Sequence, residues 1–258
     1  MKKKIVTCSL VVALLVIGVI GASLAYFTDT DNATNKFTVG NVDIDLIESN
    51  AVKDGTLPDD FTQDQKLVPG KSNDGNAIPK IVTVKNTGEN EAYVWVDIKV
   101  PEDLVSADFK TGHKDESKNA LHWNSYGYFS GYYPNYKASA VADGIINDAG
   151  AIQIAGMVDD VQKYQWTDFT YVEQKDGYVV LRAKMANTLP AGKTSLPALR
   201  QVYMDWRVTA DGNNYNLPDG TTIGTDKSWE VKVEAYAIQA DGFDNVDAAI
   251  AAFANNGN

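Results

Sequence analysis

The apolar residues of this chain recur mainly at every second position, and this period limits the fold more than any other feature of the sequence. In Trp229–Gln239, the odd-numbered positions are aromatic or aliphatic up to Ala237. Charged residues alternate with them at Glu230, Lys232 and Glu234. Side chains two positions apart lie on the same face of an extended strand, so this pattern is typical of a strand with one buried face.

Several other segments are rich in β-branched and aromatic residues and are also expected to be strands. They are Val42–Ile47, Ile81–Lys85, Tyr93–Val100, Gly177–Ala186 and Gln201–Thr209. Turn sequences such as Pro190-Ala191-Gly192 separate them. Many strands joined by turns, without alternating helices, predict an all-β fold, namely a β-sandwich.

Two short helices are expected beside these strands. One is Glu102–Phe109, which follows Pro101. The other follows Asp244 as its N-cap, and its apolar residues form one stripe. The stripe consists of Val246, Ala249, Ile250 and Phe253.

Residues 101–170 fit the strand pattern least. They have no flanking linker and no core pattern of their own, so we interpret them as an insertion between sheet strands and not as a separate domain. Seven aromatic residues crowd the segment Trp123–Tyr136. Packing into the core is the favoured interpretation of this aromatic-rich insertion, and stacking on a carbohydrate or a partner protein is the alternative.

The start of the chain differs from the rest. Lys2–Lys4 precede the apolar run Ile5–Ala22, and small residues follow where a signal peptidase would cut, directly after Ala25. We therefore predict a signal peptide over residues 1–25, cleavage between Ala25 and Tyr26, and a secreted single domain over residues 26–258. An uncleaved anchor is the alternative, since the run approaches the ~20 residues that span a bilayer. After cleavage no stable membrane span is expected.

The inventory of chemically active residues is small. The single cysteine, Cys8, lies in the predicted signal peptide, so no disulfide or cysteine nucleophile is expected in the mature chain. His113 and His122 lie outside any H-E-x-x-H motif, and no G-x-S-x-G motif is present. A net charge of −11 disfavours nucleic acid as a partner. The sequence thus predicts no enzyme, no cofactor and no metal site, but a protein that acts by assembly or binding.

The predicted mature N-terminus suggests how such assembly would work. Residues 26–39 start with the aromatic pair Tyr26 and Phe27, continue as a polar stretch, and end in β-forming residues. An exported segment of this kind, without an evident partner in its own chain, can add a strand to the open sheet edge of a neighbour. A disordered tail before the first strand is the alternative.

The same region carries a family resemblance. Leu24–Asp29, followed by Phe37–Ile44, resembles the N-terminus of the TasA/camelysin family of Gram-positive exported proteins. Similar, weaker matches occur at Leu67–Gly70, Val82–Gly88 and Val233–Ala240. The matches bracket the predicted mature chain, whereas residues 101–170 resemble nothing we can name.

The resemblance implies a jelly-roll-like antiparallel β-sandwich that forms homopolymeric fibres of the extracellular biofilm matrix. The family's signal peptides are cut by a SipW-type signal peptidase. Its fibres form by donor-strand exchange, in which the mature N-terminus completes the sheet of the next subunit. Carried onto this sequence, the donor strand is residues 26–39, with the donor residues Tyr26, Phe27, Thr28, Asp29, Lys36, Phe37 and Val39. An accessory matrix subunit is a further partner to consider, and the acceptor groove is not assigned.

Three further hypotheses accompany this reading. Lys36, in the predicted donor, could form an isopeptide bond with an acceptor Asn or Asp, with Glu234 as the activating acid, although solvated surface residues are the favoured interpretation. The runner-up function is a monomeric cell-surface binding module, for carbohydrate or as an adhesin, that acts through the aromatic insertion. A secreted metalloprotease, as some family members are described, is the third, and the two histidines supply no ligand motif for it.

Overall fold

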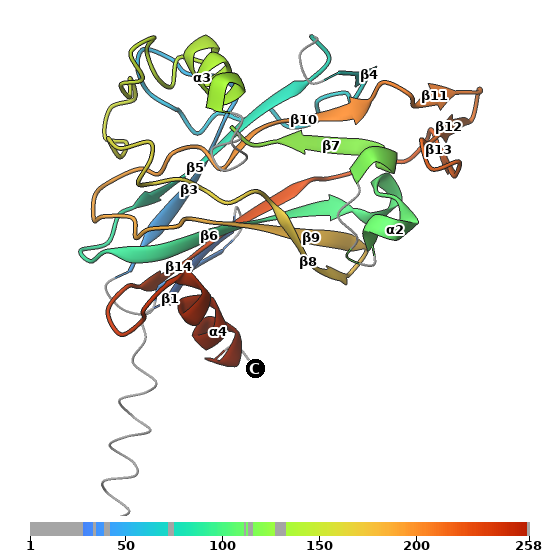
Figure 1. The fold of residues 1–258 in the computed structure, drawn as a ribbon. Coiled ribbons are helices and arrows are strands. Elements are labelled where there is room, and N and C mark those ends of the chain that lie inside the picture. The colour runs from blue at the N-terminus through green and yellow to red at the C-terminus, as the bar shows by residue number, and fades with distance from the viewer. Residues whose placement is uncertain are drawn as a thin grey trace, which may run out of the picture.

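The computed structural model describes residues 28–32, 35–38, 42–71, 75–110, 112, 116–126 and 133–256. The predicted signal peptide therefore lies outside the described residues. Two sheets, antiparallel apart from the short parallel pairing of β4 (Pro69–Gly70) with β10 (Leu199–Asp205), face each other in this part of the chain, and a small third sheet extends from one end (Figure 1). The prediction of an all-β, jelly-roll-like sandwich with short helices is confirmed.

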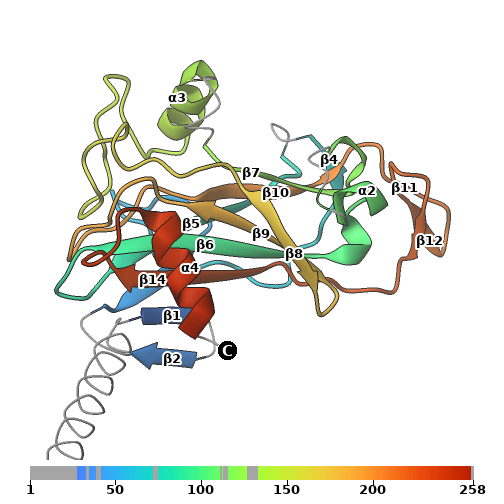
Figure 2. The same ribbon diagram turned by 60° about the horizontal axis from the view of Figure 1, so that its bottom comes forward.

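The first large sheet has six strands. In spatial order they are β2 (Asn35–Thr38), β1 (Thr28–Asn32), β14 (Lys232–Gln239), β6 (Ala92–Pro101), β9 (Tyr178–Lys184) and β8 (Thr170–Lys175). Every neighbouring pair in it is antiparallel. The first and the second-to-last elements of the described chain, β1 and β14, are thus neighbours in one sheet, as Figure 2 shows.

The second large sheet has five strands. They are β3 (Ile44–Ser49), β5 (Ile78–Asn86), β10 (Leu199–Asp205), β4 (Pro69–Gly70) and β7 (Leu121–Asn124), the last of which pairs with β10. The third, small sheet consists of β11 (Thr209–Ala210), β12 (Asn214–Asn216) and β13 (Thr222–Gly224).

The main core lies between the two large sheets. Alternate residues of the long strands are fully buried there, for example Val94, Val96 and Ile98 of β6 and Val82 and Val84 of β5. Each of the six predicted strand segments contains or overlaps an observed strand. Period-two alternation located these strands because one face of each packs on a core and the other faces solvent or a helix.

The segment 101–170 is partly an elaboration and partly a component of the sandwich. The predicted helix Glu102–Phe109 is two separate turns, a 3-10 turn at Glu102–Leu104 and α2 (Ala107–Lys110). It breaks because Val105 is extended and the Ser106 Oγ accepts a hydrogen bond from the backbone N–H of Phe109 at 3.3 Å, as a helix cap does.

The rest of this segment joins the core at several points. A second 3-10 turn, Glu116–Lys118, leads into β7, which belongs to the second sheet. α3 (Tyr133–Ala142) lies over one end of that sheet in Figure 1. Trp166 and Phe169, at the end of the segment, are buried in the main core.

The predicted C-terminal helix is present as α4 (Val246–Asn256). Its N-cap is Asn245 and not Asp244, because the backbone N–H of Ala248 donates to Asn245 Oδ1 at 3.0 Å. In Figure 2 α4 crosses the outer face of the six-stranded sheet, over β14 and β6. Within the described residues, no helix has the length and apolar composition needed to cross a membrane.

Candidate functional site

The N-terminal hairpin forms one edge of the six-stranded sheet. β1 pairs with β14 over four residue pairs, from Thr28 opposite Ile238 to Asp31 opposite Ala235. The other side of β1 pairs with β2, so β2 is the outermost strand (Figure 2). The structure thus places the described part of the predicted donor on the sheet of its own subunit.

β14 is covered on both faces, which makes it a firm support for the strand beside it. Its core face carries Val233, Ala235 and Ala237, and the two alanines are fully buried. Its outer face carries Tyr236 and Ile238, which pack in a second, smaller apolar cluster under α4. Along the edge opposite β1, β14 pairs with β6 over its whole length. Removal of β1 would therefore expose a row of backbone groups on a strand that other elements still hold.

Three aromatic rings fasten α4 to the outer face of β14 and β6. The rings of Trp95 and Tyr236 stack with their centroids 5.6 Å apart and an interplanar angle of 6°. Phe253 of α4 meets both rings nearly edge-on, with centroid distances of 5.1 Å to Trp95 and 5.5 Å to Tyr236. Offset stacking and edge-to-face contacts are the favoured geometries for aromatic pairs, so this cluster stabilises the sheet next to the hairpin.

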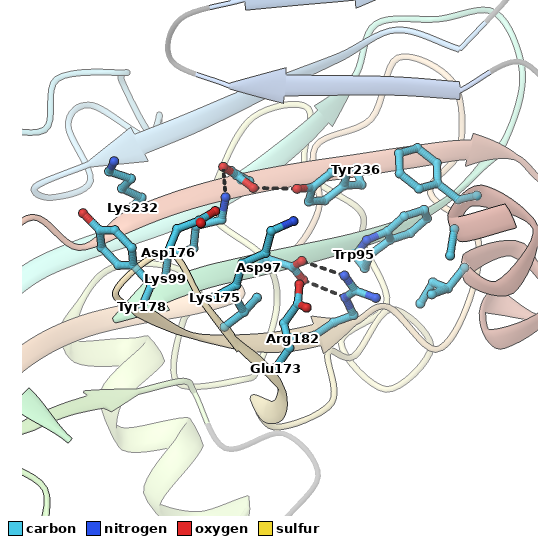
Figure 3. Close-up of a pocket in the computed structure, with 15 residues that line it drawn as sticks. Trp95, Asp97, Lys99, Glu173, Lys175, Asp176, Tyr178, Arg182, Lys232 and Tyr236 are labelled. Atoms are coloured by element: carbon cyan, nitrogen blue, oxygen red, sulfur yellow. Dashed lines mark hydrogen bonds and ion pairs between the residues drawn. The ribbon is translucent and has the colours of Figure 1, made fainter. Parts of the chain in front are cut away.

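Beyond the aromatic cluster, a row of ion pairs crosses the outer face of the sheet (Figure 3). Arg182 donates two hydrogen bonds to the carboxylate of Asp97, at 2.7 and 2.6 Å. Lys99 pairs with Glu234, and the hydroxyl of Tyr236 donates to Glu234 at 2.5 Å. Asp97 is only 3% exposed, and burial raises its pKa, a shift that the Arg182 guanidinium opposes.

The two residues of the isopeptide hypothesis lie on strands that are not neighbours. Lys36 is opposite Asp31 on β1, and Glu234 lies on β14, with β1 between the two strands. Strands two apart in a sheet are separated by ~9–10 Å. The carboxylate of Glu234 already pairs with Lys99 and accepts a hydrogen bond from Tyr236. Within one subunit the structure does not bring the pair together, and a link between subunits stays a prediction.

The remaining predicted site residues fall into two groups. Thr28 and Asp29 lie in β1, and Phe37 lies with Lys36 in β2. The predicted cleavage site and the ends of the donor lie outside the described residues: Ala25, Tyr26, Phe27 and Val39.

His122 is packed in the way expected of a structural histidine. Its Nε2 lies 2.9 Å from Asp205 Oδ2, and its ring stacks on Tyr203 at a centroid distance of 5.3 Å. Burial lowers the pKa of His122, and the neighbouring Asp205 carboxylate opposes that shift. His113 lies outside the described residues. Among the residues that are described, no three His, Cys, Asp or Glu side chains gather closely enough to hold a metal ion.

Two members of the aromatic cluster in the insertion have described side chains. Trp123 and Tyr126 are 8% and 2% exposed and belong to the main core. The Tyr126 hydroxyl donates to Asp143 at 2.8 Å. Core packing, the favoured interpretation from sequence, is confirmed for these two. Nothing is described of the other five side chains: Tyr128, Phe129, Tyr132, Tyr133 and Tyr136.

The opposite edge of the six-stranded sheet is β8, and its design is different. β8 is largely exposed, Val172 included, and its pairing with β9 shifts register between Tyr171 and Glu173. A tight turn with positive φ at Asp176 and Gly177, 53° and 81°, joins the two strands. A bulge and charged side chains are the usual protections of an exposed sheet edge against pairing with another chain.

Sequence reasoning did not find a buried lysine in the second sheet. Lys80 Nζ lies 2.6 Å from Glu48 Oε1 and 3.8 Å from the ring centroid of Phe61, and its side chain is 4% exposed. Burial lowers the pKa of Lys80, against the opposing charge of Glu48. The sequence did contain a signal for this burial. Lys80 lies two and four positions before the apolar Val82 and Val84, so the three side chains share one face of the strand.

No protein-family model, no curated protein and no solved structure matches this chain. What the protein does must therefore be inferred from its own residues and geometry.

Proposed function

We propose that this chain is a secreted structural subunit that polymerises into extracellular biofilm matrix fibres by donor-strand exchange of its mature N-terminus. The proposal rests on the sequence resemblance to the TasA/camelysin family and on one structural observation. That observation is the position of β1, which is the first described strand and pairs with a β14 that is supported independently of it. Copies of the same chain and a SipW-type signal peptidase acting at Ala25–Tyr26 are the partners that the proposal implies.

The hairpin can leave the sheet at small cost. It joins the domain only through the residues after β2, and four residue pairs tie β1 to β14. The register sets Asp29 opposite Ala237 and Asp31 opposite Ala235, both fully buried alanines. Polar residues at these positions add little apolar burial to the ladder, and apolar burial is the main stabilising contribution in a sheet. Detaching β1 therefore breaks its backbone ladder with β14 and separates it from β3, while Asp29 and Asp31 contribute little apolar burial to either contact.

A strand from a second copy fits the vacated edge. With its own β1 displaced, β14 keeps its ladder with β6 and its cover by α4, and it offers unpaired backbone groups from Ala235 to Ile238. The β1 of another subunit has the same sequence and can adopt the same register, as in domain swapping. Each subunit then gives a strand at one place and accepts a strand at another. Such a head-to-tail contact generates an open filament when it does not close into a ring.

The two alternatives have less support. A monomeric binding module that works through the aromatic insertion needs exposed rings, and Trp123 and Tyr126 are buried. For a metalloprotease, His122 is engaged with Asp205 and Tyr203, and the described residues contain no cluster of metal ligands.

Pairs of single cysteines test the exchange directly. In the mature protein, which lacks Cys8 if cleavage follows Ala25, Asp31→Cys and Ala235→Cys place one thiol in β1 and one in the opposite position of β14. Directly opposed strand positions lie within the Cα separation that a disulfide spans. Fibres grown from an equal mixture of the two single variants should give disulfide-linked dimers after mild oxidation, detected on non-reducing gels.

Controls make the experiment decisive. Fibres of either variant alone should give no specific dimer, and a mixture of Asp31→Cys with Glu173→Cys, on the β8 edge, should not cross-link. The double variant Asp31→Cys/Ala235→Cys provides the opposite test. If its fibres contain only monomers with an internal disulfide, β1 stays on its own subunit and donor-strand exchange is wrong.

A further inference from the structure

A groove lies on the outer face of the six-stranded sheet, and β14, the strand that pairs with the hairpin, forms one side of its floor. Its floor is formed by β6, β9 and β14, one end is closed by α4, and the β8–β9 hairpin forms the other boundary (Figure 3). The volume is about 550 Å³. This lies within the range of ~300–1,000 Å³ that is common for small-molecule sites. The proposed strand exchange uses the backbone edge of β14 and the cover by α4, but not the charged side chains of this face.

The charges in the groove balance. Four acidic side chains line it: Asp97, Glu173, Asp176 and Glu234. Four basic side chains line it as well: Lys99, Lys175, Arg182 and Lys232. On a chain with a net charge of −11, such a neutral area is a departure from the average surface. A groove without net charge has no field that would attract a polyanion or a polycation.

The groove is also poorly suited to peptides and to apolar ligands. A peptide that adds to a sheet needs unpaired backbone groups, and β6, which runs through the floor, is paired on both sides with β14 and β9. An apolar ligand would remove water from charged groups such as Lys99 and Arg182 without replacing their hydrogen bonds. What remains is a neutral ligand with many hydrogen-bonding groups.

Hydroxyl groups meet these requirements. Each one donates and accepts, so it can bond a carboxylate and an ammonium group without breaking the pairs Asp97–Arg182 and Lys99–Glu234. The half-buried ring of Tyr178, with the Lys232 ammonium over it at 5.0 Å from the centroid, lies at one end, and Ile250 and Phe253 lie at the other. The remaining apolar surface of these side chains suits the C–H faces of sugar rings.

The length of the groove indicates a chain of several sugars. Its lining runs from Trp95 on β6 to Tyr178 on β9. Tyr178 lies opposite Pro101 of β6, which is six residues beyond Trp95. Six residue steps along a strand span ~20 Å. We propose that this groove is a binding site for a neutral oligosaccharide, separate from the strand exchange at the sheet edge.

Calorimetric titration of the mature protein tests the site. The probes are three neutral hexasaccharides, maltohexaose, cellohexaose and laminarihexaose, and one charged hexasaccharide, hexagalacturonic acid. At least one neutral probe should bind with a dissociation constant of about 1 mM or tighter. Tyr178→Ala should weaken that binding at least tenfold, and Glu173→Gln at least threefold, whereas Tyr178→Phe should keep it.

Trp206→Ala is the matched control, because Trp206 is 59% exposed and does not line the groove. Its binding should equal that of the unchanged protein. The proposal is wrong if no neutral hexasaccharide binds, if hexagalacturonic acid alone binds, or if Trp206→Ala loses as much affinity as Tyr178→Ala. Near-ultraviolet circular dichroism of each variant establishes that the fold is retained.

Discussion

The two edges of the six-stranded sheet have opposite designs. At one edge, β8 lies in the middle of the chain, is tied to β9 by the turn at Asp176 and Gly177, and is interrupted by a bulge. At the other edge, the β1–β2 hairpin is the first described element and is held by a short, regular ladder to β14. The first edge resists pairing with another chain, and the second can be exchanged without rerouting the polypeptide.

This difference teaches that an edge is made available by where its strand lies in the sequence as much as by its side chains. An internal strand such as β8 cannot leave without disturbing the elements before and after it. A hairpin that cleavage after Ala25 would leave at the N-terminus can, and the strand that it leaves behind, β14, remains fixed by β6 and α4. The following changes test this contrast, from the largest expected effect to the smallest.

Deletion of residues 26–38 should abolish fibres. It removes the β1–β2 hairpin and leaves the main core between the large sheets intact, so the monomer should stay folded. Electron microscopy and sedimentation measure assembly, and circular dichroism measures the fold. The matched change at the other edge, Val172→Lys in β8, should leave fibres unaltered. Fibres that persist after the deletion would show that neither edge of the sheet is needed for assembly, and that the contrast between the two edges has no role in it.

Arg182→Ala should destabilise the centre of the sheet, between the two edges, by about 3 kcal/mol at pH 7, because it leaves the Asp97 carboxylate buried without its partner. Burial raises the pKa of Asp97, so acid protonates this carboxyl readily once Arg182 is gone, and the penalty should shrink toward pH 4.5. Urea unfolding at both pH values measures it. In the control Lys184→Ala, the pair with the exposed Asp247 is lost at a cost under about 1 kcal/mol. Equal penalties for the two variants would contradict this account.

Phe253→Ala should lower the free energy of unfolding by about 2 kcal/mol, since its ring contacts both Trp95 and Tyr236 but is only partly buried. Loss of the ring should loosen the β14 edge more than the β8 edge. Hydrogen exchange of backbone amides measures that difference, in β14 for the first edge and in β9, the neighbour of β8, for the second. Val172→Ala in β8 serves as the comparison and should change stability by no more than about 0.5 kcal/mol. Uniform loosening of both strands would show that α4 does not act on one edge.

Glu116→Gln should leave both edges alone and change only the pH dependence of stability. Burial, with a smaller effect from the charge of Asp168, raises the pKa of Glu116 from 4.5 to about 7. The folded state therefore binds the proton more tightly than the unfolded state. The stabilisation that results is fully present below pH 4.5 and is lost as the pH rises through 7. The glutamine variant should lose this decline and gain about 1 kcal/mol at pH 8, allowing for partial exposure. Denaturation curves at pH 5 and 8 test this, and unaltered fibre formation is the second expected result.

The fold was predictable wherever one period extended over a long segment. β14 and α4 follow directly from the alternation in Trp229–Gln239 and from the stripe that includes Ala249 and Phe253. β7 was not predicted, because Leu121–Asn124 is four residues long and too short to display a period. The N-cap was misplaced by one residue because Asp244 and Asn245 are both good caps, and only the backbone geometry selects between them.

The candidate site was predictable in part. The sequence indicates a strand-forming N-terminus but not that β1 pairs with β14, since the polar residues Thr28–Asn32 carry no apolar pattern that would select a partner. Ion pairs such as Asp97–Arg182 join residues on different strands, and local sequence contains no signal for such pairs. The groove is a product of the same long-range pairing.

The pairing of β1 with β14 also has a consequence for the order of events during synthesis. About 200 residues separate Thr30 from Tyr236, and a ribosome adds residues at ~5–20 per second. β1 is therefore complete for roughly 10 s or more before the strand that would hold it within its own chain exists. Contacts between such distant segments also form slowly. The ladder between β1 and β14 is therefore expected to be among the last parts of the fold to form.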